Sequence, residues 1–362
     1  MASVDGKALK PKKAEIVELL KKLELGVVPD EEIKHLVRIQ LERRLEWGYK
    51  STYEQQISHV LNLVHSLRQM SIMTEEVETF DSEFYELPIS FWKIKLGRAM
   101  KQSCCYFKDE LTTLDEAEEA MLELYCERAQ IEDGQRVLDL GCGYGSLTLY
   151  IARKYPNCHV TGLTNSISQK QFIEEQCKDS NLSNVNIILV DVATHETDET
   201  FDRIMVVGLL EHMKNYELFL RKLLKWMKQD GFLFIDHVCH KALAYIYEPV
   251  DEDDWLPECT FPSGTIVIPS AHFLLYFQDD ASVVNHWIIN GKNYRRTSEE
   301  WLKRIDANAN ALKAIMGSVS RKEDEAVRLT NYWRTLLLFH IELFKYNNGE
   351  EWMVAHILFK KK

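Results

Sequence analysis

Residues 137–145 read Val-Leu-Asp-Leu-Gly-Cys-Gly-Tyr-Gly, and this stretch decides the fold. A short apolar run contains Asp139 near its end, and a G-x-G-x-G turn follows. Residues 146–155 then carry apolar side chains at helical spacing. This order predicts a buried strand, a tight glycine turn and the N-terminus of a helix. Because glycine has no Cβ atom, such a turn can let the backbone approach a ligand, or it can simply close a strand–helix corner.

The spacing of the glycines narrows the ligand class. A dinucleotide-binding turn has the spacing G-x-G-x-x-G, whereas the third glycine here, Gly145, comes one residue earlier. With Asp139 in front of the turn, the stretch resembles motif I of class I S-adenosylmethionine (SAM) methyltransferases. The resemblance implies a SAM-binding site that includes Asp139, Gly141 and Gly143.

Regular alternation of apolar runs and helical patterns surrounds this stretch. Strands are predicted at residues 137–140, 159–163, 185–190, 203–207 and 232–237, with helices at 146–155, 167–178 and 216–229 between them. This alternation predicts an α/β, Rossmann-like fold with a parallel sheet covered by helices on both faces. A late strand over residues 351–360 is expected to rejoin the sheet.

The remaining segments predict four parts of the chain. Amphipathic helical patterns fill roughly the first seventy residues, and aromatic side chains crowd residues 80–107. We therefore expect a helical N-terminal extension and pocket wall, a SAM-binding α/β core, an inserted substrate cap, and C-terminal helices with the late strand. Their expected bounds are 1–110, 111–238, 239–310 and 311–362. The acidic run at 251–254 is expected to be solvated or helix-capping rather than catalytic.

Composition excludes several classes of protein. The 362 residues are 46% hydrophobic and 28% charged, which is typical of a soluble globular chain. No apolar run reaches the roughly 18 residues of a membrane span, and no signal peptide is visible. The net charge of −12 disfavours nucleic acid as a partner. The eight cysteines lack zinc or C-x-x-C spacing, so we expect free thiols and a cytoplasmic location. A homodimer is left open.

Polar residues follow the predicted strands at their carboxyl ends, where ligands bind on parallel sheets. These are the glycine turn, residues 164–169, Asp191 with Val192, residues 208–212 and residues 236–240. The last group contains Asp, His and Cys, but adjacent strand residues point to opposite faces, so these side chains would not converge on one ion. We predict no metal site.

The residues after the second strand indicate a branch of the methyltransferases. Many such enzymes carry an acidic residue there, whereas Leu-Thr-Asn-Ser-x-x-Gln stands at residues 163–169. This pattern resembles the cyclopropane-fatty-acid-synthase-like branch, which implies Thr164 and Gln169 at the ribose and Asp191 at the adenine amine. The cofactor-binding residues expected in full are Ser103, Tyr106, Asp139, Gly141, Gly143, Thr164, Asn165, Gln169, Asp191 and Val192.

Longer strings carry a more specific resemblance. They are Gln-Ser-Cys-Cys-Tyr-Phe at 102–107, Tyr-Cys-Glu-Arg-Ala-Gln at 125–130, Glu-His-Met-Lys-Asn-Tyr at 211–216, and further strings at 251–255, 275–280 and 346–353. From about residue 12 onward the chain resembles plant benzylisoquinoline alkaloid N-methyltransferases, such as the coclaurine, tetrahydroprotoberberine, pavine and reticuline enzymes. The resemblance implies a SAM-dependent N-methyltransferase that leaves S-adenosylhomocysteine (SAH) and acts on an alkaloid amine.

The chemistry needs a base, because an amine attacks the methyl group only through a free lone pair. His212 is the natural candidate, since an unperturbed imidazole titrates near neutral pH. Glu211 could orient it or stabilise positive charge on the amine. The family implicates this pair in catalysis and places residues matching Tyr85, Glu86, Phe261 and Trp333 around the alkaloid. The pair could instead be an acidic helix start, and the aromatic residues could be core.

One position departs from the coclaurine-type pattern, which has glutamate three residues before the Glu-His pair. This chain has Gly208. Glycine cannot hold an N–H group and leaves room, so we expect a shift toward bulkier tertiary amines and quaternary products. Coclaurine-type methylation of secondary amines stays an alternative. Two further alternatives are a lipid C-methylating or cyclopropane-forming enzyme and a SAM-binding scaffold without turnover.

Overall fold

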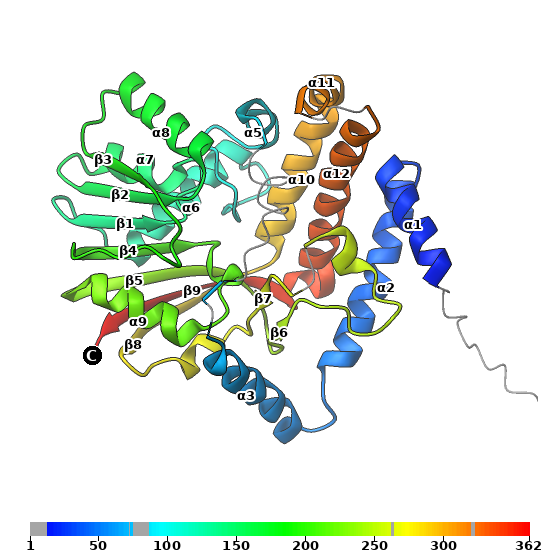
Figure 1. The fold of residues 1–362 in the computed structure, drawn as a ribbon, viewed down its shortest axis with the longest axis horizontal. Coiled ribbons are helices and arrows are strands. Elements are labelled where there is room, and N and C mark those ends of the chain that lie inside the picture. The colour runs from blue at the N-terminus through cyan, green and yellow to red at the C-terminus, as the bar shows by residue number, and fades with distance from the viewer. Residues whose placement is uncertain (1–12, 72, 75–86, 262–263, 320–322) are drawn as a thin grey trace, which may run out of the picture.

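The computed structural model describes residues 13–71, 73–74, 87–261, 264–319 and 323–362. It joins a twisted α/β half, which contains the sheet, to a helical half formed by helices from the first fifty residues and from residues 292–345 (Figure 1). The shared core is apolar and includes residues from both halves. Within the described residues, none of the helices combines the length and the apolar character that crossing a bilayer requires.

In the part of the chain that the structure describes, the main sheet has seven strands. Five are parallel neighbours, and β9 and β8 extend the sheet with antiparallel pairings on the far side of β5. The order is β3 (Val185–Leu189), β2 (His159–Thr164), β1 (Arg136–Leu140), β4 (Phe201–Val207), β5 (Met227–His240), β9 (Trp352–Lys361) and β8 (Ala281–Ile289). The central strands are buried on both faces, because helices in three of the parallel crossovers, those from β1 to β2, from β2 to β3 and from β4 to β5, cover the sheet.

The helices of the α/β half follow the expected pattern. α7 packs against β2, α8 against β3 and α9 against β5. Their bounds, with that of the preceding helix α6, are α6 (Leu114–Arg128), α7 (Ser146–Lys154), α8 (Ile167–Asp179) and α9 (Tyr216–Trp226). The start of α6 is fixed by a reciprocal capping box between Thr113 and Glu116.

The helical half is organised around α12 (Glu323–Lys345), which packs against α1, α2, α10 and α11 (Figure 1). The surrounding helices are α1 (Lys13–Leu25), α2 (Asp30–Gly48), α10 (Lys292–Ala307) and α11 (Ala309–Val319). Two more, α3 (Tyr53–Gln69) and α5 (Ile89–Lys95), contact α9 and α10, respectively. Helices from the predicted N-terminal part and from the predicted C-terminal part therefore pack together in one helical layer.

The segment predicted as a cap differs from the expectation. Ala281–Ile289 is strand β8 of the main sheet, so residues 239–310 are not a single insertion outside it. This strand could not be predicted from local sequence, because among the described residues β8 pairs only with β9, which lies about seventy residues later. Shorter elements complete the segment: β6 (Tyr245–Ile246), β7 (Val267–Ile268), η3 (Leu256–Cys259) and η4 (Phe273–Tyr276).

The acidic run at 251–254 binds arginines of α2. Arg43 pairs with Asp251, and Arg44 Nη2 lies 2.6 Å from Asp254 Oδ2, with both side chains of the second pair buried. The Arg44 guanidinium also lies 5.1 Å from the ring centres of Tyr245 and Tyr247. Breaking a buried pair by removing one partner leaves an uncompensated charge, so this contact fixes the 245–254 loop on the helical layer.

Candidate active site

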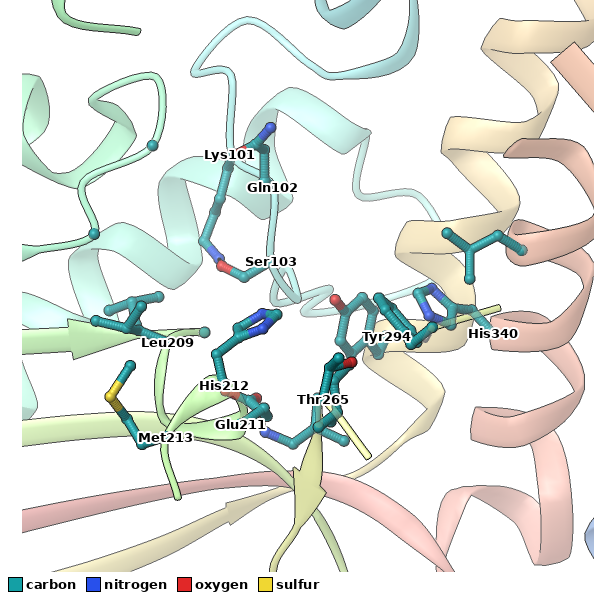
Figure 2. Close-up of a pocket in the computed structure, with 18 of the residues that line it drawn as sticks. Lys101, Gln102, Ser103, Leu209, Glu211, His212, Met213, Thr265, Tyr294 and His340 are labelled. Atoms are coloured by element: carbon teal, nitrogen blue, oxygen red, sulfur yellow. Dashed lines mark hydrogen bonds between the residues drawn. The ribbon is translucent and has the colours of Figure 1, made fainter. Parts of the chain in front are cut away.

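A cavity of about 660 Å³ lies at the carboxyl ends of the parallel strands, where the sheet meets the helical layer. Its size is in the range of small-molecule sites. Figure 2 shows Glu211 and His212 projecting from the end of the sheet into a space bounded by Lys101 and Ser103 on one side and by Tyr294 and His340 on another. The cavity therefore places the cofactor edge of the sheet beside the aromatic helical layer.

Most of the predicted site residues meet at this cavity. Those that line it are Ser103, Asp139, Gly141, Gly143, Thr164, Asn165, Gln169, Asp191, Val192, Gly208, Glu211, His212, Phe261 and Trp333. Tyr106 is not among the lining residues; its backbone N–H donates to Ala117 O, and its side chain packs beside a core cluster. Tyr85 and Glu86 lie outside the described residues.

The glycine turn brings the backbone to the cavity wall. Gly143 has a φ of +54°, and a Cβ atom there would lie 3.1 Å from Gln102 Oε1, so a larger residue would be strained and crowded. Beneath the turn, Thr148 Oγ1 donates to Asp139 Oδ2 at 2.6 Å. Burial raises the pKa of Asp139 to about 6. The turn is thus held by a buried contact between β1 and α7.

The ends of β2 and β3 present fixed polar groups. Thr164 Oγ1 donates to Gln169 Oε1 at 2.6 Å, and both side chains are buried. Asp191 Oδ1 accepts a hydrogen bond from Ala193 N at 2.7 Å, which orients the carboxylate. Asn165 is exposed at the rim. A cofactor with hydroxyl and amine groups fits this set of donors and acceptors.

A buried polar chain supports Ser103. Lys101 Nζ donates to Ser103 Oγ at 2.5 Å and to Tyr125 Oη at 3.0 Å, and Tyr125 Oη donates to Asp236 Oδ2 at 3.0 Å. His356 Nε2 lies 2.9 Å from the same Asp236 oxygen. Burial would raise the pKa of Asp236, but His356, the Lys101 charge and the Tyr125 hydroxyl hold it below its ordinary value. The charged carboxylate therefore anchors the 101–103 segment.

Glu211 is buried in the short 3-10 helix η2 (Leu210–His212). Its Oε1 accepts a hydrogen bond from Val238 N at 2.6 Å, whereas Oε2 has no hydrogen-bond partner among the described residues. Burial raises the pKa of Glu211 to about 7, and the charge of Asp236 contributes a smaller increase. A ligand's N–H group that donates to such a buried acceptor gains binding free energy, because the acceptor would otherwise stay without a partner.

His212 follows Glu211 and also lines the cavity. Burial and the positive charge of Lys214 lower the pKa of His212 to about 4. The imidazole is therefore neutral at physiological pH and can accept a proton. Its basicity is low as long as the cavity holds no additional negative charge.

The backbone conformation at residue 208 favours glycine. Its φ is +63°, and its N–H donates to Asp236 O at 3.1 Å. Among the described residues, a Cβ atom at this position would meet only Ser103 Cβ, at 3.8 Å. The position therefore has space for a side chain but a conformation that side chains rarely adopt.

The helical side of the cavity is aromatic. Phe261 stacks on His340 with ring centres 6.2 Å apart, and Trp333 packs edge-on against Trp92 at 5.4 Å. Tyr294, from α10, lines the same wall. Such a wall suits a flat, largely apolar ligand.

Comparison with known proteins identifies the family. The family model described as "Mycolic acid cyclopropane synthetase" matches residues 73–334. The chain is 63% identical to "(S)-coclaurine N-methyltransferase" of Thalictrum flavum subsp. glaucum over 99% of this chain and 100% of that protein. It is 54% identical to "Pavine N-methyltransferase" of the same plant over 97% and 98%, respectively. The chain belongs to the plant alkaloid N-methyltransferases of this family.

A solved structure agrees with the assignment. It is a coclaurine N-methyltransferase bound to N-methylheliamine and SAH, with a TM-score of 0.94 and 61% identity over 96% of this chain and 99% of that one. The predicted family, the class I methyltransferase fold and the assignment as a SAM-dependent N-methyltransferase are confirmed. The roles of individual residues stay predictions.

Sequence reasoning missed several residues of the cavity wall. They are Lys95, Gln102, Leu209, Met213, Thr265, Tyr294 and His340. For Lys95 a signal was present, because it follows Trp92 by three residues on one helix and so lies on the same, buried face. Tyr294 and His340 are brought to the wall by packing of α10 against α12, for which the sequence holds no local signal.

Proposed function

We propose that this enzyme transfers the methyl group of SAM to the ring nitrogen of a benzylisoquinoline-type alkaloid. The observation that carries the proposal is the buried Glu211 carboxylate. Its Oε2 has no hydrogen-bond partner among the described residues, and the residue lines a cavity that it shares with the glycine turn. The names of the relatives, which are coclaurine, pavine and tetrahydroprotoberberine N-methyltransferases, support the substrate class.

The described residues fit the cofactor. Bound SAM supplies an electrophilic methyl group on a positively charged sulfur. The glycine turn would accommodate its amino-acid end, the Thr164–Gln169 pair its ribose and Asp191 its adenine amine. These assignments rest on the cradle at Gly143 and on the oriented polar groups of the strand ends.

Glu211 and His212 have different parts in the reaction. An alkaloid amine enters mostly protonated, and Glu211 Oε2 accepts its N–H and attracts its positive charge. Neutral His212 receives the proton and frees the lone pair, which attacks the methyl carbon as the carbon–sulfur bond breaks and its electrons stay on sulfur. Burial and the Lys214 charge lower the pKa of His212 to about 4, which makes this transfer unfavourable by itself. A negative charge on Glu211 would offset part of that cost by stabilising the imidazolium. Holding amine and methyl together in a dry cavity supplies much of the acceleration.

We further propose that Gly208 widens the range of amines toward tertiary ones. The space beside this residue supports the proposal, since among the described residues a Cβ would meet only Ser103 Cβ, at 3.8 Å. We also propose a cytoplasmic location, which the eight free cysteines support.

The test is turnover measured by mass spectrometry with SAM and two acceptors in parallel, coclaurine as the secondary amine and reticuline as the tertiary one. N-methylated product from either supports the proposed function. Faster formation of quaternary product from reticuline supports the role of Gly208, and faster methylation of coclaurine overturns that role. No product from either amine, together with methylation of an unsaturated phospholipid, would replace the alkaloid proposal by lipid methylation.

A further inference from the structure

Lys95, the last residue of α5, is a buried lysine surrounded by three indole rings. Its side chain is 5% exposed, and Nζ lies 5.1 Å from the ring centre of Trp92, 4.6 Å from that of Trp301 and 4.3 Å from that of Trp333. The three tryptophans come from α5, α10 and α12, so tertiary packing assembles this cage. A cation over an aromatic face is attracted by the ring quadrupole.

The ammonium group has no hydrogen-bonding or ionic partner among the described residues. None of their ion pairs or side-chain hydrogen bonds involves Lys95 Nζ. Lysine is almost never fully buried without a partner, because its ammonium carries three donors and a full charge. Burial lowers the pKa of Lys95 to about 7, and the Lys95 charge, after burial, helps to lower the pKa of neighbouring His340 to about 3. The rings stabilise the charge but satisfy none of its donors.

Lys95 is also part of the cavity wall, as are all three rings of its cage. The Lys95 donors, which have no partner among the described residues, therefore border the space that the substrate fills. An acceptor atom of a bound ligand would satisfy them without moving the helices.

The charges of the cavity give a ligand one orientation. Glu211, at the edge of the sheet, attracts an alkaloid ammonium, whereas Lys95, on the helical side, repels it. The face of Trp333 that points at Lys95 is already occupied by a cation, so it is not available to the substrate nitrogen. What fits beside Lys95 is the part of an alkaloid that carries acceptor atoms, namely the oxygen-bearing aromatic rings.

We propose that Lys95 is a specificity-determining residue whose ammonium group donates a hydrogen bond to a hydroxyl or methoxyl oxygen on an aromatic ring of the substrate. The inference rests on the proposed function, and it adds to it that the enzyme selects oxygenated ring systems. The three tryptophans hold the donor in place, so the hydrogen bond costs little side-chain ordering on binding.

The test compares two secondary amines that differ only in ring oxygens, 1-benzyl-1,2,3,4-tetrahydroisoquinoline and its tetramethoxy derivative. Both are assayed with wild type, with Lys95→Met, which keeps the length of the side chain, and with Lys95→Arg, which keeps the charge. Lys93→Met is the matched control, because Lys93 is an exposed lysine on the same helix. Thermal unfolding and SAH binding show whether each variant is folded.

We expect Lys95→Met to lower kcat/KM for the tetramethoxy amine by about 10- to 100-fold, the loss expected for a hydrogen bond from a charged donor. The unsubstituted amine should change by about twofold or less, and Lys95→Arg should recover part of the loss. Equal losses for both amines, or none in folded Lys95→Met, would overturn the inference. If Lys95→Met does not fold, Lys95→Arg decides. A lower ratio of kcat/KM for the tetramethoxy amine to kcat/KM for the unsubstituted amine than in wild type supports the inference, and an unchanged ratio overturns it. Failure of wild type on both amines would instead count against the proposed function.

Discussion

Replacing Glu211 by glutamine should separate the catalytic role of this carboxylate from its role in folding. The amide oxygen of the new side chain can keep the 2.6 Å hydrogen bond from Val238 N. The amide nitrogen would take the place of Oε2, which lacks a hydrogen-bond partner among the described residues. It donates rather than accepts and carries no charge. It therefore cannot hold the N–H of a protonated amine or stabilise the His212 imidazolium.

The size of the activity loss follows from these contacts. A hydrogen bond between charged partners contributes about 1.5–3 kcal/mol, and leaving a buried polar group without a partner costs about 1–3 kcal/mol. Taking about 3–4 kcal/mol for the two together, and about 1.4 kcal/mol for each factor of ten, Glu211→Gln should lower kcat/KM by about 100- to 1000-fold. SAH affinity should not change, since Glu211 is assigned to the amine.

The same substitution should stabilise the ligand-free protein at alkaline pH. Burial raises the pKa of Glu211 from 4.5 to about 7. The folded protein therefore keeps a proton that the unfolded chain loses in this range, so the stability contributed by the group is present below about pH 4.5 and is lost as the pH rises through about 7. Glutamine suffers no such loss. The unfolding midpoint of the variant should exceed that of wild type at about pH 8 and approach it at about pH 5.

The assay combines initial rates of N-methylation with thermal unfolding followed by circular dichroism at both pH values. Glu119→Gln is the matched control, because Glu119 is an exposed glutamate on α6. Activity within about threefold of wild type would refute the assignment of Glu211 to the amine, since so small a factor is under about 1 kcal/mol. A lower unfolding midpoint at about pH 8 would show instead that the ionised carboxylate is structural.

Three further substitutions test other parts of the site. His212→Asn should lower kcat/KM by about 10- to 100-fold. Because the pKa of Glu211 is raised to about 7, its ionisation predicts a rise in rate between about pH 6 and 8. The variant should keep this rise, since His212, with a pKa of about 4, is already neutral there; loss of the rise would assign it to His212. Gly208→Glu should shift the ratio of secondary to tertiary amine turnover toward secondary amines, whereas Gly208→Ala, with the same strain at φ +63°, should not; an unchanged ratio in the glutamate variant contradicts the role of Gly208. Gly143→Ala should weaken SAH binding at least about tenfold in calorimetry, because the added methyl crowds a backbone that strain already disfavours. Gly134→Ala is its control, since the φ there is +88° and a Cβ atom would meet no atom of the described residues within 4 Å. Equal SAH affinities of the two variants would show that the glycine turn does not approach the cofactor.

Much of the α/β half could be predicted from the sequence. The five parallel strands, the glycine turn and the polar residues at the strand ends follow from local patterns of apolar and polar residues, and the structure brings nearly all of the predicted cofactor residues to one cavity. Tyr106 is the exception. Its side chain packs beside a core cluster and does not line the cavity, and nothing in the string 102–107 indicated this. Strand β8 could not be predicted, because among the described residues it pairs only with β9. Both strands extend an otherwise parallel sheet with antiparallel pairings.

The sequence by itself determined the chemistry that the chain carries, because strand–turn–helix periodicity and the Glu211–His212 pair are local features. Tertiary structure alone decided the state of those groups. Glu211 has a raised pKa because folding buries it, although the hydrogen bond from Val238 N opposes the shift. Lys95 is a caged cation because α5, α10 and α12 bring three indoles around it. Desolvation and charge proximity depend on residues tens or hundreds of positions apart. A pattern of neighbours in sequence can name candidate reacting groups, but only packing sets their protonation.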